Sequence, residues 1–498
     1  MRRLSGEDSG FLSMELPTQP MTIMVVAVLR PATGSDGTPA PLTLDEVRRH
    51  LIARLDDVPV LRWRVLRVPF GLHHPVFVED PSFELENHLS HTTVPAPGGR
   101  PELDRLVAGA AEHRLDRRRP LWHLTLVDGL ENGRQALIIK LHHCLMDGAA
   151  TVATLAVLFS DDQLAGGHRM APAHRAPARE TPWPAQVTPT KAQLIGAAIR
   201  DHGRTLVLAA KLTGRSRRGL KALRAFERRT GTTLPKAVAD TPPCSLNDAF
   251  TVGRVYARLT MSLDAVMLVK ETADVTVNDV ALAVVAGALR HYLQAREDLP
   301  TRPLVANVPV AVPTGEMPPR TFGNRFSNLT TTLATDVADP WTRLRVISEV
   351  TALAKQGHAL LGPELLPDWL ECVPPFVAEP AVRRHHRSRS MNRDKADASI
   401  AVSTVRSSPD RWSFASAGVD EVTFGGPPTN GTGSNIVMFT NCNRVDVGIL
   451  SVADSLRDPQ ELAEGIQRAL DELVASARAR AATVTESMER EAPGVAEG

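Results

Sequence analysis

The residues whose types are best suited to catalysis lie in one short segment, Leu141-His142-His143-Cys144-Leu145-Met146-Asp147-Gly148. Transfer of an acyl group from a thioester to an alcohol needs a base beside the hydroxyl, because a neutral alcohol is a poor nucleophile near pH 7. His143 and Asp147 have the H-x-x-x-D spacing, and histidine is the side chain best suited to this role. We therefore hypothesise an acyltransferase site with His143 as base, Asp147 holding the loop and the ring geometry, and Gly148 permitting a sharp turn.

The residue types alone leave two other interpretations of this segment open. Adjacent histidines at a strand end are often polar residues whose ring nitrogens bond to backbone groups. A metal site would combine His142 or His143 with Asp147 and a distant histidine, from His73-His74 or His385-His386. No H-E-x-x-H or other ligand-spaced cluster supports the metal alternative.

The elements that must position the histidines are a hairpin and a helix. Two apolar stretches, 121–127 and 136–141, flank a polar connection with Asn132-Gly133, a dipeptide that favours a hairpin turn. The second stretch leads directly into the histidines. Residues 149–159 carry small and aliphatic side chains on every side, which predicts a buried helix. The histidines are therefore expected at a strand end, beside a glycine turn.

Apolar periodicity predicts the other main elements. A strand is expected at 21–29, and a helix at 44–55, with Thr43 as N-cap and Glu46 completing a capping box. In the second half we expect helices at 278–293 and 459–475, and strands at 304–312, 400–405, 436–440 and 445–452. The predicted fold is α/β with two domains: residues 1–165 with the histidine motif, a proline-rich linker and basic helical segment at 166–243, a second domain at 244–478, and a polar tail at 479–498.

Four further patterns are better explained by structure than by chemistry. Pro120-Leu121-Trp122 is typical of the start of a strand with a packed indole. Asn278-Asp279 precedes an apolar run, so we expect a helix N-cap there, with substrate binding as the alternative. Adjacent residues on an extended segment point to opposite faces, so Cys144 is expected to pack away from His143. Gly431-Thr432-Gly433 is expected to form a turn rather than a nucleotide loop.

Charge is nearly balanced over the 498 residues, with 57 Lys and Arg against 56 Asp and Glu, which argues against a nucleic-acid partner. The exception is residues 191–229, where eleven basic residues accompany only Asp201 and Glu227. Apolar residues alternate with these charges, so a basic amphipathic helix that contacts an anionic membrane or lipid-body surface is one interpretation. An ordinary solvated face around Arg217-Arg218 and Arg228-Arg229 is the other.

Cysteine use and hydropathy bear on the compartment. The four cysteines are far apart and form no C-x-x-C pair, so we expect a reducing cytoplasm and no structural zinc. The N-terminal segment lacks the apolar stretch of an export signal. Apolar runs are much shorter than the roughly 20 residues that cross a bilayer, so no membrane span is expected.

Five blocks, in order along the chain, resemble those of the bacterial wax ester synthase/diacylglycerol acyltransferase family over nearly the whole length. They are Leu4-Ser5-Gly6-Glu7-Asp8-Ser9-Gly10-Phe11 followed by Glu15, Leu115-Asp116-Arg117-Arg118-Arg119-Pro120-Leu121-Trp122, the H-H-x-x-x-D-G segment from His142 to Gly148, Asn278-Asp279-Val280, and Gly323-Asn324-Arg325.

The resemblance implies a chloramphenicol acetyltransferase-like fold, with two α/β domains joined by a crossover and an active-site tunnel at their interface. It implies that His143 is the base, supported by His142, and that no metal or tightly bound cofactor is needed. The expected reaction moves a long-chain acyl group from acyl-CoA, as co-substrate, to diacylglycerol or a fatty alcohol. The alternatives are a same-fold acyltransferase with another alcohol or amine acceptor, and a catalytically weak lipid-binding protein of lipid bodies.

Two blocks depart from the family pattern. After Val308-Pro309-Val310 the family has a small residue and an arginine, whereas this chain continues Ala311-Val312-Pro313-Thr314-Gly315. Where the family tends to show S-N-V-P-G-P, this chain has Ser403-Thr404-Val405-Arg406-Ser407-Ser408. We place both changes at substrate-facing loops, which predicts a divergent acceptor or reduced activity.

Overall fold

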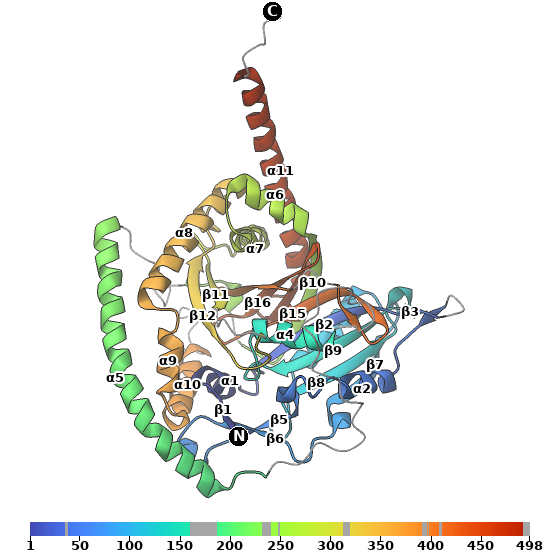
Figure 1. The fold of residues 1–498 in the computed structure, drawn as a ribbon. Helices are drawn as coiled ribbons and strands as arrows, with labels where there is room; N and C mark the ends of the chain where they lie inside the picture. Colours follow the sequence, from blue (N-terminus) through green and yellow to red (C-terminus); the bar gives the residue numbers. More distant parts are fainter. Residues whose placement is uncertain are drawn as a thin grey trace, which may run out of the picture.

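The computed structural model describes residues 1–34, 38–159, 187–231, 241–247, 250–311, 319–390, 396, 398–407 and 411–491. Two six-stranded sheets form the centre, with helices around them (Figure 1). The first sheet contains, in order, β14 (Ser413–Phe414), β15 (Ala417–Gly425), β2 (Thr22–Arg30), β9 (Gln135–His142), β8 (Trp122–Asp128) and β7 (Leu89–Thr93). The second contains β10 (Arg254–Ser262), β17 (Arg444–Val452), β16 (Ser434–Asn441), β13 (Ile400–Arg406), β11 (Val305–Ala311) and β12 (Phe326–Thr332).

The predicted hairpin before the histidines is present. β8 and β9 pair antiparallel, and their connection contains Asn132 and Gly133 with φ of 60° and 66°. Asparagine and glycine tolerate this left-handed conformation better than other residues. Every residue of β9 is buried, and its other edge pairs with β2, with His142 opposite Thr22. The first histidine, His142, is therefore the last residue of a central strand that is paired along both edges.

The edge of the first sheet is completed from the C-terminal half. β15 pairs antiparallel with β2, in a register that sets Gly418 opposite Arg30 and Gly425 opposite Met24. The sequence placed this segment in the second domain, but it belongs to the first sheet. Periodicity identifies a strand without specifying its partner, and β2 would otherwise expose an unpaired, apolar edge.

The second sheet contains the four strands predicted near 304–312, 400–405, 436–440 and 445–452. Its strands β11, β13 and β16 run parallel, and β12 and β17 flank them antiparallel. The long helix α7 (Val277–Gln294), predicted at 278–293, is buried on nearly all sides and packs against α11 (Pro459–Glu491) and α8 (Pro340–Leu361). The second sheet and these helices enclose one large apolar core.

The predicted helix after residue 43 is α2 (Leu44–Ile52). Its capping box is present: the Thr43 hydroxyl accepts from the Glu46 N–H, and the Glu46 carboxylate accepts from the Thr43 N–H at 2.8 Å. The helix after the histidines is α4 (Gly148–Leu158). The remaining elements are β1 (Arg2–Arg3), β3 (Ala32–Thr33), β4 (Pro39–Ala40), β5 (Trp63–Leu66), β6 (Val76–Glu79), α1 (Gly6–Met14), α3 (Arg100–Ala111), α6 (Leu263–Ala273), α9 (Leu365–Glu371) and α10 (Pro375–Ser390), with short 3-10 turns that include η2 (Pro69–Gly71) and η3 (Leu85–His88).

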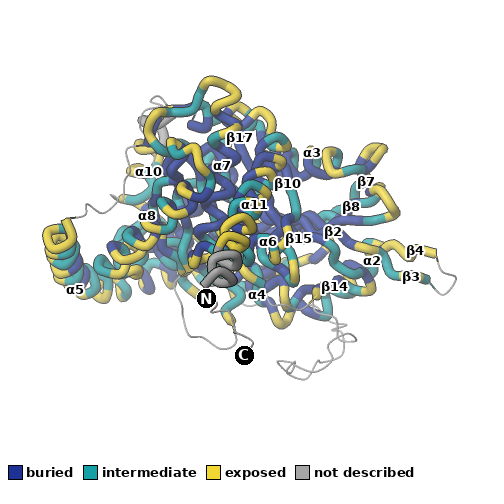
Figure 2. Tube along the Cα trace, turned by 90° about the horizontal axis from the view of Figure 1, so that it is seen from above, coloured by how far each residue is buried: buried dark blue, intermediate teal, exposed yellow. Residues whose placement is uncertain are grey.

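The basic segment forms α5 (Lys191–Thr230), a 40-residue helix at one edge of the molecule (Figure 1). The helix packs against α8 and α9, and near its start Leu194 lies in a small apolar cluster with Val76 and Val78 of β6. Figure 2 shows exposed residues along the rest of this helix, whereas buried residues gather along the central strands. An amphipathic helix is therefore confirmed. The partner of its exposed face is not part of the structure.

The last helix is longer than predicted. α11 continues to Glu491, through most of the segment that the sequence assigned to a polar tail. Residues 476–491 are rich in Ala, Arg and Glu, which favour helix but leave no apolar stripe to detect. The proline-rich residues 166–186, residues 312–315 of the first altered block and Ser408 of the second lie outside the described residues.

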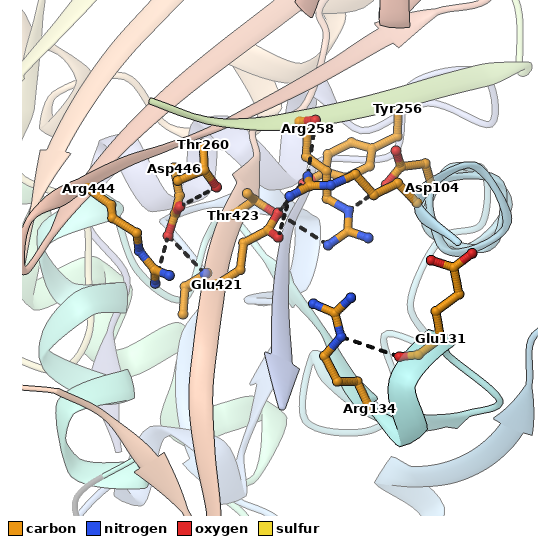
Figure 3. A network of polar contacts seen from close by, with 12 residues as sticks. Asp104, Glu131, Arg134, Tyr256, Arg258, Thr260, Glu421, Thr423, Arg444 and Asp446 are labelled. Carbon is orange, nitrogen blue, oxygen red and sulfur yellow. Dashed lines mark hydrogen bonds and ion pairs between the residues drawn. The ribbon is translucent and has the colours of Figure 1, made fainter. Parts of the chain in front are cut away.

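A buried cluster of charges joins the two halves on the α3 side of the first sheet (Figure 3). Arg258 of β10 lies between Asp104 of α3, at 2.8 Å, and Glu421 of β15, at 3.2 Å. Arg100, at the start of α3, binds the other oxygen of Glu421 at 3.0 Å. Burial raises the pKa of Asp104 to about 6 even though Arg258 acts in the opposite direction, so this carboxylate is ionised at neutral pH. The cluster therefore fixes α3 to strands of both sheets.

Two hydrogen bonds donated by hydroxyl groups extend this cluster. The Tyr256 hydroxyl donates to the Thr423 hydroxyl at 2.8 Å, and Thr260 donates to the Asp446 carboxylate at 2.8 Å (Figure 3). Burial raises the pKa of Asp446 to about 6. These strands thus meet through satisfied polar groups rather than through apolar contact alone.

Among the described helices, no single one has both the length and the apolar composition of a membrane span. The pair α6 and α7 meets those criteria jointly, with a bend of 105° between them.

Candidate active site

His143 begins the turn that joins β9 to α4. Its backbone N–H donates to the Met21 carbonyl at 2.8 Å, which extends the pairing of β9 beyond the strand end. Farther along the turn, Met146 forms a parallel bridge with Gly323, whose N–H donates to the Leu145 carbonyl at 2.5 Å. Gly323 has a φ of 77°, a conformation that favours glycine. The turn is therefore held by both halves of the chain.

The His142 side chain lies in the protein interior. Its side chain is 0% exposed, its Nδ1 accepts the Cys144 N–H at 3.0 Å, and its Nε2 lies 3.5 Å from Oε1 of Glu15. Because Nδ1 accepts, the proton is on Nε2. Burial lowers the pKa of His142, and the ring stays neutral. Burial opposes ionisation of Glu15 too, but His142 and Arg117 together lower its pKa to about 2.

The tautomer of His143 follows from the contacts of Asn324. The amide Nδ2 of Asn324 donates to Oδ1 of Asp8 and to the His143 carbonyl, both at 2.7 Å. Its Oδ1, which only accepts, lies 3.1 Å from Nδ1 of His143. Nδ1 must then carry the proton, which leaves the lone pair on Nε2. This histidine has the form required of a base.

The surroundings of His143 keep the ring neutral. It stacks on Phe11 with ring centroids 4.0 Å apart, and Phe326 lies at 6.2 Å. Burial lowers the pKa of His143 to about 4, against the opposing influence of Asp147 and Asn324. A neutral imidazole is available to take a proton throughout the neutral range.

Asp147 contacts backbone and arginine. Its Oδ1 accepts the Ala150 N–H at 2.9 Å as N-cap of α4, and its Oδ2 accepts the Arg325 N–H at 2.9 Å and the Arg320 guanidinium. These contacts hold the loop, as expected for this residue. They connect the helix that follows the histidines with the second half of the chain.

The reason for a glycine at position 148 differs from the prediction. Gly148 is outside the left-handed region of the backbone, so a sharp turn does not explain it. A β-carbon there would lie 3.1 Å from Cγ2 of Val405 on β13, which is tighter than ordinary contact. The glycine instead allows β13 to approach the start of α4. The altered block at 403–406 is therefore part of a strand beside the motif, not of a loop as predicted.

The N-D block has mainly structural contacts. The N-cap of α7 is Thr276, two residues before Asn278, and Asp279 completes its capping box. Asp279 is buried and also accepts from the Thr351 hydroxyl at 2.7 Å. Asn278 accepts from the Thr404 hydroxyl at 3.3 Å. Asn278 thus touches the altered block on β13, whereas the Asp279 oxygens are bonded within the protein.

Three other structural predictions are confirmed. Cys144 is fully buried in the first core, where burial raises the pKa of its thiol. Trp122 is buried, and its indole N–H donates to the Leu61 carbonyl at 2.6 Å. Gly431 lies in a turn, since Thr429 and Thr432 form a bridge around it. None of these residues supplies a reactive group to act beside His143.

Several site residues were missed by the sequence reasoning. Asn324, Asp8 and Glu15 lie in blocks that carry the family resemblance, but no role followed from their types. Arg117 donates to Glu15 at 2.9 Å, and Arg320 binds Asp147. The partners Asp8 and Asn324 are 316 positions apart, so no local pattern connects them. The order of the blocks was the one available signal.

The metal alternative gains no support from the geometry. Within the part of the chain that the structure describes, no three His, Cys, Asp or Glu side chains are grouped to hold a metal ion. The centroid of the His73 ring lies 5.3 Å from that of His74 and 5.7 Å from that of His202 on α5.

Comparison with known proteins identifies the family. Residues 4–281 match the wax ester synthase/diacylglycerol acyltransferase catalytic domain, and residues 322–474 match the WS/DGAT C-terminal domain. A provisionally named diacylglycerol O-acyltransferase of Mycobacterium tuberculosis is 33% identical over 470 residues, 94% of each chain.

Solved structures show the same fold. The wax ester synthase/diacylglycerol acyltransferase from Marinobacter aquaeolei VT8 is 24% identical with a TM-score of 0.65, over 96% of this chain and 100% of that one. The first condensation domain of the CDA synthetase is 16% identical with a TM-score of 0.54, over 96% of both chains. The chloramphenicol acetyltransferase-like fold is thus confirmed. By its two domain matches and its relatives, the chain belongs to the wax ester synthase/diacylglycerol acyltransferase family and is an acyltransferase.

Proposed function

We propose that the protein transfers a long-chain acyl group from acyl-CoA to diacylglycerol or a fatty alcohol, with His143 as general base. The observation that supports this role is the contact with Asn324, which places the proton on Nδ1 and leaves Nε2 of His143 as an acceptor. His142 lies in the interior, with Nδ1 bonded to the Cys144 N–H and Nε2 3.5 Å from the Glu15 carboxylate, and is the positioning residue. The family membership supports the reaction class.

The proposed reaction uses one histidine twice. Nε2 of His143 takes the proton of the acceptor hydroxyl while the hydroxyl oxygen attacks the thioester carbonyl carbon, and a C–O bond forms. The tetrahedral intermediate collapses with cleavage of the C–S bond. The proton passes from Nε2 to the sulfur, which leaves as the thiol of CoA. The ester and the neutral histidine remain, so no external oxidant, reductant or metal is required.

The preference for long chains rests on the tunnel expected between the two sheets. Each buried methylene contributes about 0.8 kcal/mol, so an apolar tunnel would favour long acyl groups. The altered strand β13 lies beside the start of α4, where its side chains would influence the acceptor. The choice between diacylglycerol and a fatty alcohol is therefore expected to depend on residues near Val405.

The decisive assay supplies purified protein with palmitoyl-CoA and a panel of alcohols and amines, and measures release of the CoA thiol. The wild type is compared with His143→Ala, after the melting temperature shows that both are folded. The expected result is thiol release with lipid alcohols that depends on His143. Equal release by both proteins would contradict the base. Release with another acceptor alone would favour the same-fold alternative, and no release by either protein would favour a lipid-binding role.

The lipid acceptor partitions into membranes or lipid bodies, and one surface of the protein suits such a partner. Three large apolar side chains of α5 are well exposed: Ile199 at 65%, Leu206 at 73% and Val207 at 57%. The adjacent turn η2 exposes Phe70 at 84%, and the start of α10 exposes Phe376 at 52%. Exposed apolar groups on a strongly basic helix are typical of peripheral contact with an anionic lipid surface.

This contact is tested by sedimentation with vesicles that contain anionic phospholipid. The double variant Leu206→Glu, Val207→Glu is expected to lose most of its binding, and added salt should weaken wild-type binding. Val252→Glu is the matched control, because Val252 is 42% exposed and lies outside α5. Binding that is unaffected by either change would contradict the lipid contact.

A further inference from the structure

A cavity of about 320 Å³ lies away from the His143 ring, on the α3 side of the first sheet. Its walls come from the end of α3, the segment that follows it, η3, β8 and β9. One wall is apolar and includes Trp122 and Ile138, and the remainder is basic. The catalytic scheme assigns no role to this cavity.

Lys140 is the buried cation in this cavity. It is 8% exposed, and its ammonium donates to the carbonyls of Ala110 and His113, where α3 ends. The end of a helix supplies only about half a negative charge. Within the described residues no carboxylate lies within ion-pair distance of Lys140, and burial lowers its pKa to about 8. A buried charge that is only half compensated favours an anion nearby.

The rim adds two more cations. Arg114 and Arg119 are exposed and line the cavity, and among the described residues neither forms a salt bridge. The only acid in the lining is Asp116, and Arg118 engages both of its carboxylate oxygens, at 3.0 and 2.9 Å. The cavity therefore presents a net positive charge to a ligand.

Two histidines on the wall supply neutral polar groups. His88 is 3% exposed and its Nδ1 bonds to the Trp122 carbonyl at 2.8 Å, which leaves Nε2 as an acceptor. His123 bonds through Nε2 to the Ser90 hydroxyl at 2.9 Å. Burial lowers the pKa of both rings, so they are neutral at pH 7. A ligand with an anionic group and a neutral hydrogen-bond donor matches this arrangement.

We propose that this cavity binds the phosphate monoester of a small organic molecule, with Arg114, Arg119 and Lys140 around the phosphate and the apolar wall against the rest. Two candidate ligands carry such a group: CoA, through its 3′-phosphate, an assignment that rests on the proposed function, and phosphatidic acid, through its head group. Lys140 lies on β9, three residues and about 10 Å along the chain before His143, which begins the turn after that strand.

The test is calorimetric titration of the wild type with adenosine 3′,5′-bisphosphate and with glycerol 3-phosphate. The double variant Arg114→Ala, Arg119→Ala is expected to bind about tenfold more weakly or worse, because two charge-assisted contacts are lost. Arg105→Ala is the matched control, since Arg105 lies on the surface of α3 and pairs with Glu102. Lys140→Met, checked for folding by its melting temperature, is expected to lose binding further.

Equal affinity of the wild type and the double variant, or no binding of either phosphate at millimolar concentration, would overturn the proposal. The titration needs no turnover, so its failure is distinct from failure of the acyl transfer. Preference for the bisphosphate, with a raised KM for palmitoyl-CoA but not for S-palmitoyl-pantetheine in the double variant, would assign the site to CoA. Preference for glycerol 3-phosphate with an unchanged KM would assign it to phosphatidic acid.

Discussion

Two sets of contacts join the halves of this acyltransferase, and they use different chemistry. At His143, the proposed base, the direct partner is a neutral amide, Asn324, whereas the cluster at α3 centres on the cation Arg258 between two carboxylates. A carboxylate in place of Asn324 would raise the pKa of His143 and stabilise its charged form. The amide orients the ring without that cost to its function as a base. The side chain that orients the His143 ring and the side chains that hold the two halves together therefore lie in different parts of the molecule.

The largest expected effect is on catalysis alone. His143→Ala should lower the rate of CoA release by about 100- to 10,000-fold, the usual contribution of positioned proton transfer. The melting temperature should change little, since the ring makes one side-chain hydrogen bond and packs on Phe11. A variant with a lowered melting temperature and wild-type activity would show that His143 serves stability rather than catalysis.

The opposite result is expected at the charge cluster. Arg258→Met leaves Asp104 and Glu421 buried without their central cation, which should lower the free energy of unfolding by about 3–5 kcal/mol. The kcat of the folded fraction should stay near the wild-type value. Urea denaturation measures the loss, with Arg105→Met, on the surface of α3, as control. An unchanged unfolding midpoint would show that the cluster does not attach the halves.

The pH dependence of kcat/KM tests the environment of the His143 ring. With a pKa of about 4, His143 remains a base until the solution becomes strongly acidic, so the acid limb of kcat/KM should lie near pH 4 rather than 6.5. Between these values the unfolded chain binds more protons at this residue than the folded one. Its contribution to stability therefore decreases as the pH falls from 6.5 to 4. An acid limb near 6.5 would contradict the neutral, buried ring.

A smaller effect is expected from the orienting amide. Asn324→Ala removes one hydrogen bond to the ring and should lower kcat by up to about tenfold, with KM nearly unchanged. Steady-state kinetics with palmitoyl-CoA separate the two constants. A rise in KM alone would indicate that Asn324 contacts substrate instead of positioning His143.

The smallest expected effect is at the edge of the charge cluster. Tyr256→Phe deletes the buried bond to Thr423 and should cost about 1 kcal/mol of stability, with no change in kcat. Thermal unfolding and CoA release on the same preparation check both statements. A loss of activity at constant stability would link this region to the reaction.

The sequence predicted the elements around His143 well because their signals are local. The hairpin turn at Asn132-Gly133, the capping box at Thr43 and the buried helix after the motif each depend on residues a few positions apart. The partners of the ring do not. Asn324 reaches His143 across 181 positions, and β15 joins β2 from the other end of the chain. Residue types do not encode such pairings.

Gly148 shows how a correct residue can carry the wrong explanation. The prediction relied on backbone freedom, because a single sequence shows what glycine permits locally and not what approaches it. The structure places Cγ2 of Val405 only 3.1 Å from where a β-carbon would be. The N-cap of α7 is a similar case: Thr276 and Asn278 both suit that position, and the observed helix begins at the earlier one.

The late arrival of β15 has a consequence for synthesis in the cell. The strand that covers the edge of β2 emerges from the ribosome about 390 residues after it, which at usual elongation rates is a delay of about 20 to 80 s. During that time the nascent chain carries an apolar strand edge without its partner. Chains that terminate before residue 411 should therefore be retained by chaperones or aggregate, even though they contain the entire histidine motif.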